Sequence, residues 1–128
     1  MQFIVDTHLL IWAVTDSEKL STAARKTLSR LNSTYFFSAA SVWEIAIKRR
    51  KYPELMPLTS EDARNLFLEA GFRELTVASH HATFVEKLPE IHEDPFDRIL
   101  IAQAIASSMK LVTHDKTIAR YGDFVITV

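Results

Sequence analysis

Five carboxylates stand at points in the sequence where a buried apolar run ends or a helix begins, and four or five of them are expected to converge on one cleft: Asp6, Glu44, Asp94, Asp97 and Asp115. Unpaired carboxylates within about 4–6 Å of one another raise each other's pKa values and destabilise a fold. A divalent cation resolves this conflict, and oxygen ligands in a chain without cysteine favour Mg²⁺ or Mn²⁺. Such an ion lowers the pKa of a bound water and polarises a phosphoryl oxygen. These acids together therefore predict a metal site with hydrolytic chemistry.

Each acid taken alone also has a structural explanation. Asp94, Pro95 and Asp97 fit the N-cap, the first and the third position of a helix, so both acids are candidates for capping it. Ser41 and Glu44 have the spacing of a capping box. Asp115 precedes the segment 116–121, which is predicted as a short helix.

Asp6 is harder to explain in this way, because it directly follows Phe3, Ile4 and Val5 and soon precedes further apolar residues. A carboxylate in such a run is expected to be buried, and its burial is costly unless it has a partner. The metal interpretation therefore depends on all of these acids occurring together and not on any one of them.

The elements that must position these acids alternate along the chain. Short apolar runs predict buried strands at 2–5, 34–37, 74–77, 110–113 and 124–128. Helical periodicity lies between them, over 20–31, 41–51, 60–70, 79–87 and 95–109. This alternation predicts a parallel sheet covered on both faces, in a single α/β domain over residues 1–128. Ligands of such sheets sit beyond the carboxyl ends of the strands, where the acids stand.

Composition narrows the function further. The chain has 128 residues, 48% of them hydrophobic, with 15 basic and 16 acidic side chains and no cysteine. This excludes a cysteine nucleophile, an Fe–S cluster and a thiolate zinc site. The net charge of −1 gives no general attraction to nucleic acid, so such binding needs a local patch or a bound cation. The apolar start of the chain is interrupted by Asp6 and His8, which predicts a cytoplasmic protein without a membrane segment.

Four segments resemble a known family. Asp6-Thr7-His8 with Trp12-Ala13, the run from Ser38 to Lys48, the motif Asp94-Pro95-Phe96-Asp97-Arg98, and Thr113-His114-Asp115 look like a PIN domain. More narrowly, they resemble the VapC-type toxins of type II toxin–antitoxin pairs, in the branch that carries the DPFDR motif. The resemblance covers essentially the whole chain, in order and in spacing.

This resemblance implies a three-layer α/β/α domain with a mainly parallel sheet of four to five strands, and the activity of a Mg²⁺- or Mn²⁺-dependent endoribonuclease. Carried over by position, the family's catalytic and metal-binding acids are Asp6, Glu44, Asp97 and Asp115. We prefer Asp97 to Asp94 as the ligand, with Asp6 and Asp97 the direct ones. The implied partners are an RNA substrate, a cognate antitoxin and a second copy of the chain in a homodimer.

Secondary site candidates are Thr7, Thr113, Asp94 and Arg98, and candidates for RNA binding are Lys48, Arg49 and Arg50. The threonines either hydrogen-bond the carboxylates or a phosphate, or are ordinary hydroxyls at strand ends. Arg98 either contacts phosphate or pairs with an acid, and the basic cluster also suits the C-terminal end of a helix. His8 and His114 are expected to line the site. Trp12 and Trp43 are candidates for stacking on bases, although such aromatics more often pack in a core or an interface.

Two other functions remain as alternatives. A receiver-like signalling module also binds Mg²⁺ with aspartates at strand ends, but it needs a phosphoacceptor aspartate after a middle strand. Here the run 74–77 is followed by Ala78, Ser79 and His80, which argues against that function. The second alternative is a catalytically inactive PIN-fold protein that only binds a partner.

Overall fold

The computed structural model describes residues 1–128 and contains one sheet of five strands, all parallel. The strands are β1 (Gln2–Val5), β2 (Thr34–Ser38), β3 (Arg73–Leu75), β4 (Lys110–Thr113) and β5 (Val125–Thr127). Their order across the sheet is β3-β2-β1-β4-β5. The central strand β1 therefore lies between β2 and β4, and all five carboxyl ends meet at one edge.

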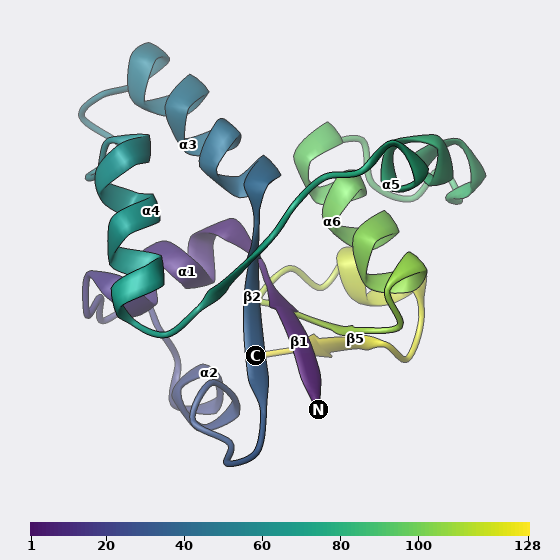
Figure 1. The fold of residues 1–128 in the computed structure, drawn as a ribbon, viewed down its shortest axis with the longest axis horizontal. Helices are drawn as coiled ribbons and strands as arrows, with labels where there is room; N and C mark the ends of the chain where they lie inside the picture. Colours follow the sequence, from purple (N-terminus) through teal and green to yellow (C-terminus); the bar gives the residue numbers. More distant parts are fainter.

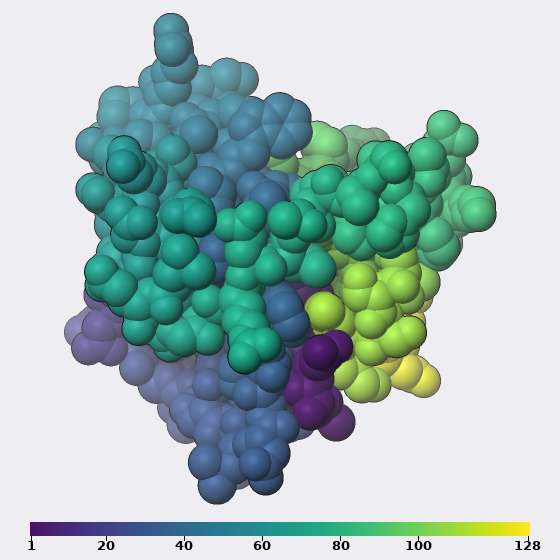
Figure 2. All heavy atoms as spheres, in the orientation of Figure 1, coloured from purple at the N-terminus to yellow at the C-terminus, as the bar shows by residue number.

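Helices cover both faces of this sheet (Figure 1). The α-helices are α1 (Thr7–Val14), α2 (Thr22–Thr27), α3 (Ala39–Lys51), α4 (Ser60–Glu69), α5 (Ser79–Phe84) and α6 (Pro95–Ala106), with 3-10 turns η1 (Val85–Lys87) and η2 (Ile118–Tyr121). Helices α1 to α4 lie on one side, and α5, α6 and η2 lie on the other. Figure 2 shows the chain from α4 through β3 to α5 passing across the front of the molecule. The three-layer α/β/α domain is as predicted.

The sheet is buried on both faces because successive side chains of a strand point in opposite directions. Phe3 and Val5 belong to the core cluster beneath α1 to α4, whereas Ile4 between them belongs to the cluster beneath α6. All three side chains are fully buried. Continuous apolar runs, rather than alternating ones, are therefore what this sheet requires.

Several element boundaries differ from the predictions. Helix α3 begins at Ala39, two residues before the predicted start, because the Ser38 side chain caps it by accepting from the Ala40 N–H. The proposed capping box of Ser41 and Glu44 is therefore wrong. The buried Ser41 hydroxyl instead accepts a hydrogen bond from Thr7.

The remaining helices are shorter than their apolar periodicity suggested. The periodic segment 20–31 is helical only over α2, and α5 gives way to the 3-10 turn η1. Helix α6 ends at Ala106, because Ser108 adopts a positive φ of 54° and the Met109 N–H bonds the Ala104 carbonyl. The third strand ends at Leu75 rather than at residue 77. None of the helices is both long enough and apolar enough to cross a membrane.

Candidate active site

Asp6 connects the central strand to α1 and is buried at the carboxyl edge of the sheet. Its side chain is the N-cap of α1 and accepts from the Leu9 N–H at 2.9 Å. Its second oxygen accepts a hydrogen bond from Thr113, at the end of β4, and lies 3.6 Å from His114 Nδ1. The expected burial of Asp6 is confirmed, and the neighbouring strand supplies the donor that its carboxylate needs.

Glu44 reaches the same edge from the second turn of α3, with only 3% of its surface exposed. Its Oε2 lies 2.5 Å from the Lys48 ammonium, one helical turn further on. Its Oε1 is buried and has no hydrogen-bond partner. A buried carboxylate oxygen without a donor is costly, so Glu44 has room for one more positive ligand.

Asp94 and Asp97 have different environments at the start of α6. Asp94 is the N-cap, as predicted, and accepts from the N–H groups of Phe96 and Asp97 at 2.8 and 3.3 Å. Asp97 in the first turn receives no such backbone donor and lies 3.2 Å from His92 Nε2. Its position is the one expected of the acid that faces the site.

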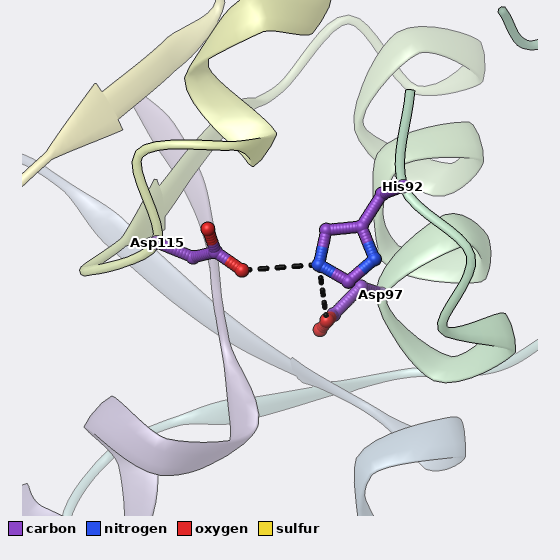
Figure 3. Close-up of side chains that lie close together, drawn as sticks. All are labelled: His92, Asp97 and Asp115. Carbon is purple, nitrogen blue, oxygen red and sulfur yellow. Dashed lines mark hydrogen bonds and ion pairs between the residues drawn. The ribbon is translucent and has the colours of Figure 1, made fainter. Parts of the chain in front are cut away.

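Asp115 approaches from the loop after β4, and its Oδ2 lies 3.0 Å from the same His92 nitrogen. Figure 3 shows His92, Asp97 and Asp115 directed at one another from three separate segments of the chain. One potential ligand atom from each lies within 4.8 Å of the others. The structure thus brings together acids that are 18 positions apart or more in the sequence.

The pKa of Asp97 is raised from 3.8 to about 7, chiefly by burial and then by the negative charge of Asp94. Glu44 and Asp6 raise it further, whereas the neighbouring His92 opposes the shift. These influences place Asp97 in the field of the other acids. The combined negative charge of the acids therefore affects Asp97 more strongly than the nearby His92 does.

His92 was missed by the sequence analysis, which considered only His8 and His114. It lies in the irregular segment between η1 and α6, where hydrophobic periodicity carries no information. The available signal was local, since His92 stands two residues before the helix cap and its Nδ1 accepts from the Asp94 N–H at 3.1 Å. That hydrogen bond leaves Nε2 directed at the acids.

For two of the secondary candidates, the structure excludes one of the alternatives that the sequence left open. The Arg98 guanidinium pairs with none of the acids but donates to the carbonyls of Val85, Pro89 and His92 at 3.0 to 3.2 Å. Arginine suits this position because its planar fork offers several fixed donors. Thr7 likewise bonds Ser41 rather than a carboxylate, whereas Thr113 bonds Asp6 as predicted.

The basic residues at the end of α3 have three different roles. Lys48 pairs with Glu44, and Arg49 donates to the carbonyls of Pro53 and Met56 at 3.3 and 2.7 Å. Arg50 is exposed. Only part of the predicted RNA-binding cluster is therefore available to a ligand.

The family model that matches this sequence describes the PIN domain, and it covers residues 3–123. The chain belongs to the PIN domain family. Three solved structures share the fold of this PIN domain. VapBC2 from Rickettsia felis, bound to a DNA fragment from its promoter, aligns with a TM-score of 0.72 at 17% identity, over 100% of this chain and 98% of the other.

A toxin–antitoxin complex from Klebsiella pneumoniae aligns with a TM-score of 0.67 at 18% identity, over 97% of this chain and 95% of the other. VapBC-1 from nontypeable Haemophilus influenzae aligns with a TM-score of 0.61 at 16% identity, over 94% of this chain and 92% of the other. No curated protein matches this chain significantly.

The donors of this PIN domain fit a hard divalent cation. Carboxylate oxygens from four segments meet at one edge, one of them buried without a partner, and the nearby nitrogen ligand is a single imidazole. Mg²⁺ and Mn²⁺ take carboxylate oxygens in preference to sulfur, and an imidazole is compatible with Mn²⁺. The residues that would hold the ion are the acids that the sequence predicted, together with His92 as a ligand or as a support for Asp97 and Asp115.

Proposed function

We propose that this PIN domain is a Mg²⁺- or Mn²⁺-dependent endoribonuclease and that it is the toxin of a toxin–antitoxin pair. Asp6, Glu44, Asp97 and Asp115 are the proposed catalytic acids. The observation that carries the proposal is the buried Glu44 Oε1, which has no hydrogen-bond partner at the edge where the acids gather. The pKa of Asp97 is raised chiefly by burial and, after that, by the charges of the neighbouring acids. A metal-binding site explains why a small domain retains so costly an arrangement.

A bound cation supplies Lewis acidity and an activated water for attack on a phosphodiester. The chain's own residues hold that site in place. Thr113 and the Leu9 N–H fix the Asp6 carboxylate from two directions. His92 orients Asp97 and Asp115 through one nitrogen, and Lys48 balances one oxygen of Glu44. Each proposed ligand is thus oriented by a second residue, as is usual around metal sites.

The direct test is incubation of the purified protein with single-stranded and structured RNA in Mg²⁺, in Mn²⁺ and in chelator. We expect cleavage that needs the cation and that Asp6→Asn abolishes. Asp123→Asn is the matched control, because that acid is exposed and lies outside the cluster. Equal cleavage by wild type and Asp6→Asn would exclude this site, and absence of cleavage under every condition would favour a PIN fold that only binds a partner.

The antitoxin proposal is supported by the folds to which this chain is similar, since all three solved structures contain toxin–antitoxin proteins. The ion pair between Lys48 and Glu44 offers a physical precedent, because it shows that the cluster accepts an ammonium group. An arginine or lysine from an antitoxin would occupy the cluster in the same way and exclude the cation. Co-expression with the product of an adjacent gene tests this, with copurification and loss of cleavage as the expected results.

Self-association and a cytoplasmic site of action are further parts of the proposal. Trp43 is 63% exposed and packs edge-on against Phe96, beside an apolar groove between α3, α5 and α6. This surface is the candidate contact for a homodimer. Light scattering measures the oligomeric state, and a monomer at high concentration would contradict this part.

A further inference from the structure

A hollow with a volume of about 570 Å³ opens between α1, the end of α3 and the segment 52–57, and we call it the α1–α3 hollow. Its lining includes His8, Trp12, Lys19, Lys48, Tyr52 and Leu55. The volume is in the range of small-ligand sites, which span about 300–1,000 Å³. The hollow is thus large enough for one nucleotide.

The α1–α3 hollow adjoins the acidic cluster on two sides. The ring centroids of Trp12 and His114 lie 4.9 Å apart, and His114 Nδ1 lies 3.6 Å from the Asp6 carboxylate. On the other side, Lys48 lines the hollow while its ammonium contacts Glu44. A ligand in the hollow is therefore one side chain away from both acids.

The lining combines aromatic rings with positive charge. Trp12, half-buried against the core, and Tyr52, 53% exposed, provide rings for stacking. Lys19, Lys48 and Glu54 are the charged residues of the lining, and the Lys48 ammonium is already paired with the Glu44 carboxylate. Proteins that bind single-stranded nucleic acid combine aromatic side chains, on which bases stack, with cations along the backbone. The two aromatic rings are therefore the main reason to expect a base in this hollow.

The wall of the hollow opposite α1 is fixed before any ligand arrives. Arg49 donates to the carbonyls of Pro53 and Met56, and the Met56 side chain is buried in the core. These contacts hold the segment 52–57 in place. A preformed site loses less entropy on binding than one that must first become ordered.

We propose that the α1–α3 hollow binds one unpaired nucleobase of the RNA substrate, next to the phosphodiester that the acidic cluster cleaves. This rests on the proposed ribonuclease function and adds a base-binding contact beside the proposed site. A base inside a duplex is paired and stacked on both faces, so it reaches a hollow of this kind only from a single strand or a loop.

The test compares variants by the Kd for a fluorescently labelled single-stranded RNA hexamer in chelator, and by KM and kcat for its cleavage with Mg²⁺. Trp12→Leu is expected to raise Kd and KM about 5- to 150-fold, because one base-stacking contact is lost, while kcat changes less. Trp12→Phe restores most of the affinity. A complementary strand annealed to the hexamer is expected to prevent both binding in the hollow and cleavage.

A matched pair of leucines keeps the test decisive if Trp12→Leu does not fold. Leu55 lines the hollow and is 75% exposed, whereas Leu31 is 89% exposed on the connection between α2 and β2. Leu55→Glu places a negative charge among the lysines and is expected to raise Kd at least about fivefold, while Leu31→Glu leaves it unchanged.

The proposal is overturned if Leu55→Glu binds the hexamer as wild type does, or if Leu31→Glu weakens binding equally. It is also overturned if Leu55→Glu impairs only the complex with an antitoxin, which would make the hollow a protein-binding site. Failure of the ribonuclease function gives a different result, because the wild type then cleaves no RNA with any cation while the Kd values in chelator still report on the hollow.

Discussion

Two acids at the edge of the sheet contact the same imidazole nitrogen, yet their pKa values move in opposite directions. Asp97, at the start of α6, has its pKa raised to about 7 by burial and by the charges of Asp94, Glu44 and Asp6, against the influence of His92. Burial also raises the pKa of Asp115, in the loop after β4, but hydrogen bonds from His92 and Thr117 outweigh it, and the net shift is downward.

The difference lies in how many donors each segment supplies. The Thr117 N–H donates to Asp115 at 2.8 Å, whereas the nearest free N–H groups at the start of α6 are taken by Asp94. Asp115 therefore has hydrogen bonds both from His92 and from its own loop, whereas Asp97 has no backbone donor and is left among the other acids. The acid with the fewest protein donors is the one that gains most from a cation.

The largest expected effect concerns cleavage. Asp97→Asn is expected to lower kcat/KM about 10²- to 10³-fold, the scale of losing a main electrostatic contact. Asp115→Asn is expected to cost about 10- to 100-fold, typical of a supporting residue. Steady-state cleavage of a single-stranded RNA with Mg²⁺ measures both, and a larger loss for Asp115→Asn would reverse the assigned roles.

Removal of the shared imidazole is the next largest change. His92→Ala is expected to lower activity about 10- to 100-fold, because both acids lose the group that orients them. It also removes a hydrogen bond that lowers the pKa of Asp115, so the pKa of Asp115 is expected to rise toward that of Asp97. The pKa values can be followed by NMR titration of the carboxyl carbons, and an unchanged Asp115 would show that Thr117 alone determines its shift.

The metal-free protein should show the effect of Asp97 on stability. Its folded pKa of about 7 lies above its ordinary value of 3.8, so the native state binds more protons than the unfolded state between these values. Stability from this group is complete below pH 3.8 and is lost as pH rises through 7. We expect the loss to be on the order of 1–3 kcal/mol, reduced by the partial exposure of the carboxylate.

Urea denaturation in chelator at pH 5, 6, 7 and 8 measures this loss, and Asp97→Asn should remove most of it. The opposite sign applies to Asp115, whose lowered pKa contributes stability above its ordinary range that disappears as pH falls. Mg²⁺ should raise the Tm more at pH 8 than at pH 6, because protons compete for the ligands. Equal increases at both pH values would contradict this.

The smallest effect is expected at Thr113, which donates to Asp6 and accepts from the Asp115 N–H. Thr113→Val keeps the shape and removes both hydrogen bonds. It should lower the free energy of unfolding by about 1–3 kcal/mol, since a buried carboxylate loses a donor. Thr113→Ser is the control and should retain most of the stability.

The fold was predictable because continuous apolar runs such as 2–5 and 110–113 fit only strands buried on both faces. The place of Asp6 followed from the same reasoning, and the cap at Asp94 followed from the proline after it. The contacts of His92 and Arg98 were not predictable, because they are side-chain hydrogen bonds made by, or to, the irregular segment that precedes α6. Sequence periodicity records which face of an element is apolar, and it contains no information on such loops.

The order of the strands has a consequence for when the acidic cluster can form. Asp6 and its donor Thr113 are 107 positions apart in the sequence. Strand β4 must dock beside β1 before Thr113 and Asp115 reach Asp6. During synthesis on the ribosome, the cluster is therefore incomplete until β4 has emerged and paired with a strand made far earlier in the chain.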